Sequence, residues 1–181
     1  MWLIKALVHL ALFAFENDIM FIFLDTEFTS LEEPYLVSAG LIAGSREIYF
    51  EIAGISPAIC SPFVQTNVLP LLGSSRLRAI EIATQLAEFL APCGPEVTFF
   101  CDAPRYDIEL LMPFFPAGLR WKCAVPSFEN PECEQIFDIA KETAFASGLR
   151  RHHALDDARA LAAAWAVLMS TPRRETETYQ R

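Results

Sequence analysis

Basic side chains, paired cysteines and long apolar runs are scarce in this sequence of 181 residues, and each shortage excludes a class of protein. Lysine and arginine number 14 against 23 aspartates and glutamates, so the net charge is -9 and there is no general basic field that would coat duplex DNA or RNA. The five cysteines form no C-x-x-C pair, and there is no histidine cluster at zinc spacing. Unpatterned cysteines indicate free thiols in a reducing compartment, so we expect a cytoplasmic protein.

The apolar stretch at the N-terminus does not predict a membrane anchor. Residues 1–15 are mostly apolar, but they include Lys5 and His9 and lack a small-residue cleavage site. They also fall short of the roughly 20 residues that span a bilayer. A strongly patterned strand opens at Met20. We therefore expect three parts: an extension over 1–19, which is an added helix or the product of an upstream start, a folded domain over 20–170, and a polar tail over 171–181.

The apolar content and its spacing predict a single α/β domain. Hydrophobic residues make up 53% of the chain, which is enough for one sizeable core. Apolar runs of strand length, with a hairpin turn between the second and third, predict an antiparallel three-strand meander at the start of the domain. The expected strands are 20–24, 35–43, 47–52, 96–101 and 135–139. The expected helices are 75–90, 105–112, 141–147 and 154–169, and residues 117–133 are expected to be irregular.

Four carboxylates lie where predicted strands pass into turns or helices. Asp25 and Glu27 are two residues apart at the end of the first strand, so their side chains point to the same face and can share one metal ion. A solvated pair at the strand end explains the same pattern. Asp102 follows the fourth strand and is accounted for as the N-cap of the next helix. Asp107 lies inside that helix, where a capping role is unavailable, and is either a surface residue or part of a site at the end of the sheet.

Two histidines and two aspartates surround the start of the last predicted helix. Helical geometry pairs His153 with Asp157 at i, i+4, whereas His152 lies five residues before Asp157 and would have to sit at the helix entrance. Asp156 is accounted for as an acid that stabilises the helix N-terminus. The spacing alone leaves two interpretations of the histidines, a solvated turn or part of a site.

Three segments resemble the three exonuclease motifs of the DEDDh family, in the family's order. They are residues 23–29 (FLDTEFT), 102–111 (DAPRYDIELL) and 152–158 (HHALDDA). The resemblance implies that residues 20–170 are an exonuclease domain with a ribonuclease H-like fold, in which a mixed sheet with an antiparallel three-strand meander is flanked by helices. It also implies a set of site residues, with metal ligands Asp25, Glu27, Asp107 and Asp157 and the general base His152. Cys101-Asp102 stands where many members of the family have His-Asn. Asp138, in the expected fifth strand, resembles a structural aspartate often found before a helix in this family.

The resemblance further implies a two-metal-dependent 3′-to-5′ exonuclease that releases nucleoside 5′-monophosphates. An all-oxygen ligand set suits Mg²⁺ or Mn²⁺, and four carboxylates need about two such ions. His152 can take the proton of the attacking water near neutral pH. The Thr26 backbone is placed to meet the terminal sugar, and Phe28 either stacks on a base or belongs to the core.

The small number of basic residues predicts a short single-stranded substrate or a frayed 3′ end. RNA is expected over DNA, and no residue of the sequence identifies a reader of the 2′-OH. Arg105, Arg150 and Arg151 lie in or beside the motifs and either contact phosphates or form solvated surface. Many exonucleases of this family act as dimers, so the resemblance leaves a homodimer open. Two alternatives to an exonuclease remain. One is a catalytically weak ribonuclease H-like module that binds nucleic acid without cleaving it, and the other is a metal-free hydrolase that uses Asp25 with Glu27.

Overall fold

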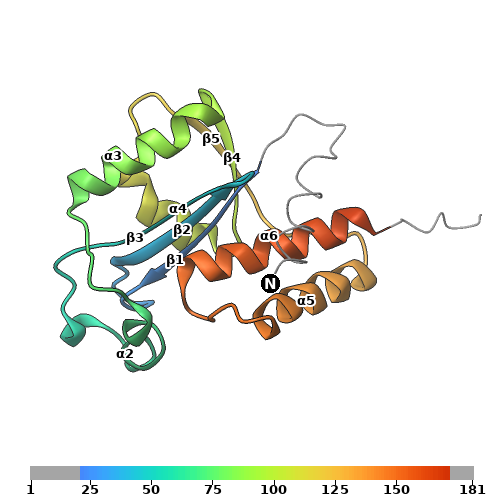
Figure 1. The fold of residues 1–181 in the computed structure, drawn as a ribbon, viewed down its shortest axis with the longest axis horizontal. Coiled ribbons are helices and arrows are strands. Elements are labelled where there is room, and N and C mark those ends of the chain that lie inside the picture. The colour runs from blue at the N-terminus through green and yellow to red at the C-terminus, as the bar shows by residue number, and fades with distance from the viewer. Residues whose placement is uncertain (1–20, 172–181) are drawn as a thin grey trace, which may run out of the picture.

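The computed structural model describes residues 21–171, which form a five-stranded sheet with helices on both faces (Figure 1). The strand order is β3-β2-β1-β4-β5. These strands are β1 (Phe21–Phe28), β2 (Leu36–Ala43), β3 (Arg46–Glu51), β4 (Glu96–Phe100) and β5 (Arg120–Ala124). The first three pair antiparallel, whereas β1, β4 and β5 pair in parallel, so the expected meander in a mixed α/β sheet is confirmed. The expectations for residues 1–19 and for the tail beyond Thr171 lie outside the described residues.

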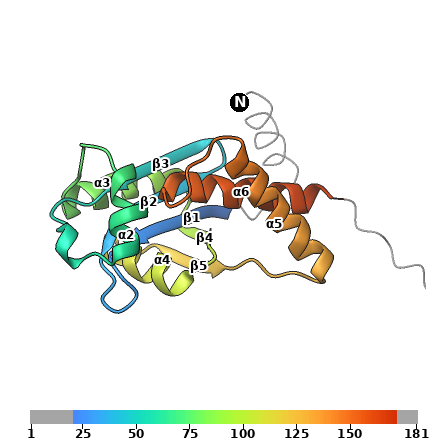
Figure 2. The same ribbon diagram turned by 90° about the horizontal axis from the view of Figure 1, so that it is seen from below.

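The helices divide between the two faces of the sheet. One face carries α3 (Ala79–Leu90) and α4 (Pro104–Leu111), and the other carries α5 (Pro131–Ala146) and α6 (Ala154–Ser170). Figure 2 shows α5 and α6 side by side, with α4 across the sheet from them. Successive β1 side chains point to opposite faces, so Ile22 and Leu24 join the first core and Phe23 joins the second. The short helix α2 (Pro62–Asn67) lies apart, over Val37 of β2.

Strand β1 continues past its expected end at Leu24. The acidic segment goes on pairing with β2, because Asp25 lies opposite Gly40 and Glu27 opposite Ser38. The register shifts between Glu27 and Phe28, where the ladder ends. Both acids are therefore fixed by ladder pairing in the middle strand of the sheet, and they do not belong to a turn.

The fifth strand was expected in the wrong place. Residues 135–139 belong to α5, a single helix that starts well before the expected one at 141. Asn130 accepts the N–H of Cys133 at the helix start and Pro131 occupies the first turn, which is a helix signal that outweighs the apolar run. The actual β5 lies in the segment expected to be irregular. It is an edge strand with mostly exposed side chains, so its apolar pattern is weak.

The helix expected over 75–90 begins at Ala79. The backbone of Leu77 instead exchanges hydrogen bonds with the chain around β3, donating to Glu51 and accepting from Ala53. This bridge holds the preceding segment extended, so the helix cannot start at Ser74 or Ser75. The last helix, α6, agrees with its expected range to within one residue.

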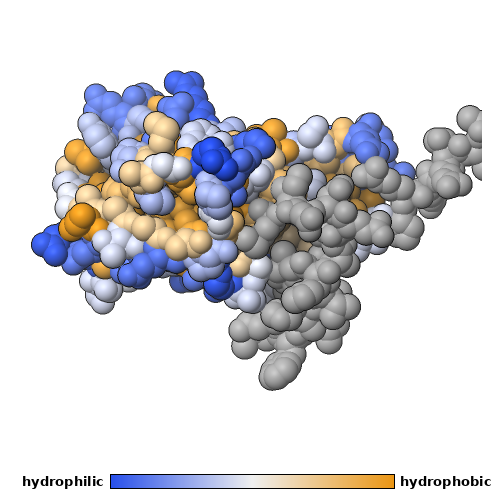
Figure 3. All heavy atoms as spheres, turned by 90° about the horizontal axis from the view of Figure 1, so that it is seen from above, coloured by the Kyte–Doolittle hydropathy of each residue, from blue (hydrophilic) through white to orange (hydrophobic). Residues whose placement is uncertain are grey.

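Large apolar side chains are exposed at several places on the described surface. Figure 3 shows apolar residues across the middle of one face, with charged residues around them. Exposed large side chains include Ile80 of α3, Leu31 and Phe63. Within residues 21–171, no helix combines the length and the apolar character needed to cross a membrane.

Candidate active site

Three carboxylates from the two ends of the described chain meet beside the sheet. Asp25 and Glu27 project from β1 on the face that α6 covers, and Asp157 lies in the first turn of α6. One oxygen from each of these three side chains lies within 4.8 Å of the other two. The period-2 prediction that Asp25 and Glu27 share a face is thus realised, and Asp157 joins them from a distant part of the sequence.

Gly40 and the start of α6 position Asp157. Gly40 of β2 faces α6, and a Cβ atom at this position would lie 2.3 Å from the Cα of Leu155. The missing side chain lets the helix backbone approach the sheet directly opposite Asp25. The Asp157 carboxylate accepts the backbone N–H of His153 at 3.0 Å, which orients it at the helix entrance.

Asp107 reaches the site from α4, on the other face of the sheet. One carboxylate oxygen accepts the backbone N–H of Thr26 at 3.0 Å and the Thr26 hydroxyl at 2.7 Å. The other oxygen accepts the N–H of Ala103, the N-cap residue of α4, at 3.2 Å. Asp107 therefore does satisfy a backbone donor at the helix start, which the sequence interpretation had excluded. It is buried, so the surface interpretation is wrong.

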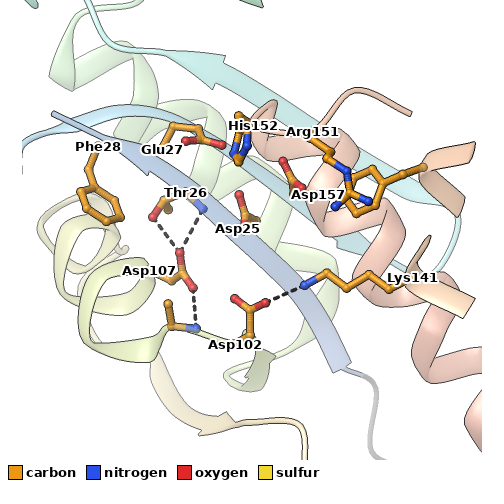
Figure 4. Close-up of a pocket in the computed structure, with 12 residues that line it drawn as sticks. Asp25, Thr26, Glu27, Phe28, Asp102, Asp107, Lys141, Arg151, His152 and Asp157 are labelled. Atoms are coloured by element: carbon orange, nitrogen blue, oxygen red, sulfur yellow. Dashed lines mark hydrogen bonds and ion pairs between the residues drawn. The ribbon is translucent and has the colours of Figure 1, made fainter. Parts of the chain in front are cut away.

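Asp102 does not cap α4, contrary to expectation. The N-cap is Ala103, and the Asp102 carboxylate instead binds the Lys141 ammonium of α5 at 2.8 Å. Parallel pairing of β1 with β4 brings this pair next to Asp25, and Figure 4 shows the ion pair beside the acids of β1. The structure places Asp138, the other aspartate singled out, on the exposed side of α5 and not in a strand.

The two histidines point in different directions. His152 has a φ of 62°, the one positive φ among the described non-glycine residues, and it lines the pocket with its ring edge-on to Phe63 at 4.9 Å. His153 is buried and stacks on Tyr49 with ring centroids 4.4 Å apart. The side-chain pair of His153 and Asp157 expected from helical spacing is absent, because only the His153 backbone reaches Asp157.

Asp156 points away from the pocket. It is buried and accepts hydrogen bonds from Arg150 and Arg159, both at 2.7 Å. Its place in the first turn of α6 agrees with the expected stabilising role at the helix N-terminus. Arg105, expected near phosphates or on the surface, lies over the Tyr106 ring and does not line the pocket.

A cavity of about 330 Å³ encloses these groups. Figure 4 shows Glu27, His152 and Asp157 around its upper part and Asp107 and Asp102 around its lower part. Phe28 lines one side and stacks on Tyr106 of α4 at 4.6 Å. The cavity-lining residues are Asp25, Thr26, Glu27, Phe28, Asp102, Ala103, Asp107, Lys141, Phe145, Arg151, His152 and Asp157.

Mutual repulsion and burial disturb every acid of the cluster. Burial raises the pKa of Asp25 well above its usual range, and the charges of the other acids raise it further. Burial, with Asp157 and Asp107, raises the pKa of Glu27 to about 8. Burial likewise raises the pKa of Asp107 to about 7 and that of Asp157 to about 6, against opposing hydrogen bonds. Such a cluster is more stable with bound protons or cations than with all of its carboxylates ionised and uncompensated.

The chemistry of this donor set fits divalent cations. Asp25, Glu27 and Asp157 offer carboxylate oxygens to a common point, whereas Asp107 lines the same cavity with both oxygens accepting hydrogen bonds from Thr26 and Ala103. These are hard oxygen ligands, without a cysteine or histidine among the converging atoms, as Mg²⁺ and Mn²⁺ prefer. His152 stands beside them, and burial and Arg151 lower its pKa, so its ring is neutral at pH 7.

Lys141 and Gly40 contribute to the geometry of the candidate site, and sequence reasoning missed both. Lys141 lies on a helix whose first half was taken for a strand, so nothing indicated that it faces the acids. Gly40 lies inside a strand-like run, and an isolated glycine in a strand is the available signal for close backbone approach.

Comparison with known proteins adds no relative. A scan of the chain against protein-family models finds no match, and a search of curated proteins finds no significant similarity. The function therefore has to be argued from the site itself.

Proposed function

We propose that this protein is a metal-dependent 3′-to-5′ exonuclease of the DEDDh type, with a ribonuclease H-like fold. One observation carries the proposal. Carboxylates from three distant segments, Asp25 and Glu27, Asp107, and Asp157, line one cavity together with His152. A solvated strand end or a set of helix caps has no reason to bring four acids and a neutral histidine together around one pocket at the cost of raised pKa values.

Mg²⁺ or Mn²⁺, about two ions, would be held by Asp25, Glu27 and Asp157, with Asp107 completing the set. Bound there, the cations supply an activated water and stabilise the leaving 3′ oxygen of the substrate. The raised pKa values support this role, because the cluster gains most from a cation when its carboxylates lack other partners. Asp107 is the exception, since three protein donors already hold it in place.

His152 acts as the general base. Its lowered pKa keeps the imidazole unprotonated at neutral pH, so the ring nitrogen can accept the proton of the attacking water. Attack on the terminal phosphodiester then releases a nucleoside 5′-monophosphate. Phe28 lines the cavity and stacks on Tyr106 with one face of its ring. The part of the ring that Tyr106 does not cover stacks on the terminal base. Both Thr26 donors are committed to Asp107, so the sugar contact assigned to Thr26 stays a prediction.

The substrate is a short single strand, with RNA favoured over DNA. The acidic chain supports this class, because the net charge of -9 opposes binding of a long duplex. All five cysteines are free, which supports a reducing compartment such as the cytoplasm. A homodimer stays a prediction that sedimentation of the full chain would test.

The deciding experiment is digestion of a 5′-labelled single-stranded RNA, with a DNA copy in parallel, in Mg²⁺, Mn²⁺ and excess chelator. We expect a ladder that shortens from the 3′ end in either metal and stops in chelator, and the faster substrate identifies the preferred sugar. Asp25→Asn, with an unchanged circular dichroism spectrum, should leave both strands intact. Binding without cleavage in both metals would support the non-catalytic module instead, and full activity in chelator would support the metal-free hydrolase.

A further inference from the structure

The wall of the cavity opposite Phe28 carries positive charge. Lys141 of α5 and Arg151 of the turn before α6 are the lysine and arginine among the lining residues. Figure 4 shows both on the far side of Asp25 and Asp157 from Phe28, with the Lys141 chain directed toward Asp102. The cavity thus has an acidic centre that suits cations and a basic side that suits an anion.

Lys141 is the more deeply placed of the two. Its side chain is 27% exposed, and its ammonium lies 2.8 Å from the Asp102 carboxylate. Burial acts to lower the pKa of Lys141, but Asp102, Asp25 and Asp157 together raise it above its usual value. The ammonium is therefore charged and within electrostatic range of the acids proposed to hold the cations.

Arg151 lies at the rim. Its side chain is 49% exposed, its guanidinium lies over the Phe145 ring at 4.1 Å, and it is paired with Glu142 on the outer side of α5. The Phe145 ring and the Glu142 carboxylate hold the guanidinium flat against the cavity wall, where it can bind an anion that enters from solvent.

A phosphodiester needs donors that the acidic centre does not provide. Its two nonbridging oxygens carry negative charge, which increases as the attacking oxygen approaches, and fixed positive groups in a partly dry cavity stabilise that charge strongly. The His152 ring is neutral and is assigned to the water, so Lys141 and Arg151 are the cationic side chains that line the cavity.

We propose, resting on the exonuclease function above, that Lys141 binds a nonbridging oxygen of the scissile phosphate and that Arg151 binds the next phosphate toward the 5′ end. Asp102 holds the ammonium in position until the substrate arrives. The depth of Lys141 beside Asp25 and the exposure of Arg151 at the rim assign the two phosphates in this order. The protein accordingly contacts two successive phosphates at the 3′ end of a strand.

Two substrates separate these roles. The p-nitrophenyl ester of thymidine 5′-monophosphate has one phosphate, whereas a pentanucleotide has several. Lys141→Met should lower kcat about 10²-fold on both, as expected for loss of one donor to transition-state charge. Arg151→Met should raise KM on the pentanucleotide and leave the ester unaffected. Lys122→Met is the matched control, because Lys122 is an exposed lysine of β5 paired with Glu96, and both substrates should be cleaved as by the unmodified protein.

A double variant separates the lost donor from the acid left behind. Lys141→Met leaves Asp102 without its ion-pair partner, so Lys141→Met with Asp102→Asn removes both charges together. The double variant should be as slow as Lys141→Met alone. Recovery of activity in the double variant would show that the unpaired acid caused the loss, and it would overturn the phosphate contact. Activity of Lys141→Met within twofold of the unmodified protein on the ester would overturn it equally.

Binding gives a readout that does not depend on turnover. Affinity for the pentanucleotide is measured in Ca²⁺ at several salt concentrations. The slope of log affinity against log salt should become shallower by about 0.7 in each of Lys141→Met and Arg151→Met, as expected for each lost contact to a single strand. Lys122→Met should keep the slope. Unchanged slopes in a protein that binds or cleaves would refute the two contacts while leaving the exonuclease proposal intact. A folded protein that neither binds nor cleaves would refute both.

Discussion

His153 stacks on Tyr49 of β3, whereas the neighbouring His152 points into the cavity. His152 has a φ of 62°, a left-handed conformation that is uncommon for a residue other than glycine. The buried ring of His153 thus packs inside the protein, whereas the ring of His152 is available to the cavity.

Substitution of the two histidines should separate these roles. His152→Gln should lower kcat about 10²-fold or more, because the general base is lost. His153→Phe keeps a ring on Tyr49 and should retain activity within about threefold. Because the pKa of His152 lies below that of an ordinary histidine, the activity of the unmodified protein should be retained at neutral pH and fall only in acid, where the ring becomes protonated. Steady-state rates of the three proteins from pH 5 to 8 test this, and equal losses in both variants would contradict it.

Removal of one acid should stabilise the cation-free protein. The pKa values of Glu27 and Asp157 are raised on folding to about 8 and about 6, so their contribution to stability is present in acid and is lost as pH rises through those values. Asp25→Asn removes one repelling charge and should raise the free energy of unfolding at pH 8 by about 1 kcal/mol, or roughly 2 to 4 °C in Tm for a domain of this size.

Thermal unfolding with and without Mn²⁺ at pH 5 and pH 8 tests the repulsion between the acids through their binding of a cation. Mn²⁺ should raise the Tm of the unmodified protein more at pH 8 than at pH 5, because the carboxylates have to be ionised to bind it. The gain should be lost in Asp25→Asn. A variant that is less stable than the unmodified protein at pH 8 without metal would show that the acids do not repel one another.

The hydroxyl of Thr26 should affect Mn²⁺ affinity or activity because it orients the carboxylate of Asp107. Thr26→Val has nearly the same shape and keeps the backbone donor, but it removes the 2.7 Å hydrogen bond that orients the carboxylate. We expect Mn²⁺ affinity or activity to fall about 10-fold, as is typical when a ligand loses its orienting partner. Thr26→Ser keeps the hydroxyl and should behave as the unmodified protein. Calorimetric titration with Mn²⁺ compares the two, and identical affinities would rule out this role.

A methyl group at Gly40 should displace α6. The added Cβ would meet the Leu155 backbone at 2.3 Å, and backbone cannot move aside as a flexible side chain can. Gly40→Ala should destabilise the protein by about 1 to 3 kcal/mol and reduce activity, since the start of α6 carries Asp157. Gly73→Ala is the matched control, because its Cβ would lie 3.6 Å from Glu51, an ordinary contact. Chemical denaturation of both variants measures the difference.

Local pattern predicted most of the fold and placed the acids of β1. The period of two puts Asp25 and Glu27 on one face wherever the strand ends, so the late end of β1 did not affect that prediction. The mistake over residues 135–139 was different in kind. The apolar run of Ile136, Phe137 and Ile139 indicates a strand. The helix signal that outweighs it, the Asn130 cap, lies upstream of the run.

The other site residues depend on contacts that no local pattern contains. The hydrogen bond from Thr26 to Asp107 joins residues 81 apart, and the ion pair of Lys141 with Asp102 depends on where α5 meets the end of β4. Helical spacing favoured His153 over His152, because a left-handed residue at the helix entrance has no signal in the spacing. Only the resemblance to a family selected His152.

The site joins the first described strand to the last described helix, and this has a consequence for synthesis. Asp25 and Glu27 leave the ribosome early, whereas Asp157 and His152 follow only with the start of α6. Because the three acids converge only after α6 has docked on β2, a nascent chain that still lacks this helix carries no complete cluster. If the protein is the proposed nuclease, this order of elements keeps the nascent chain inert beside its own messenger until the start of α6 has been made and has docked.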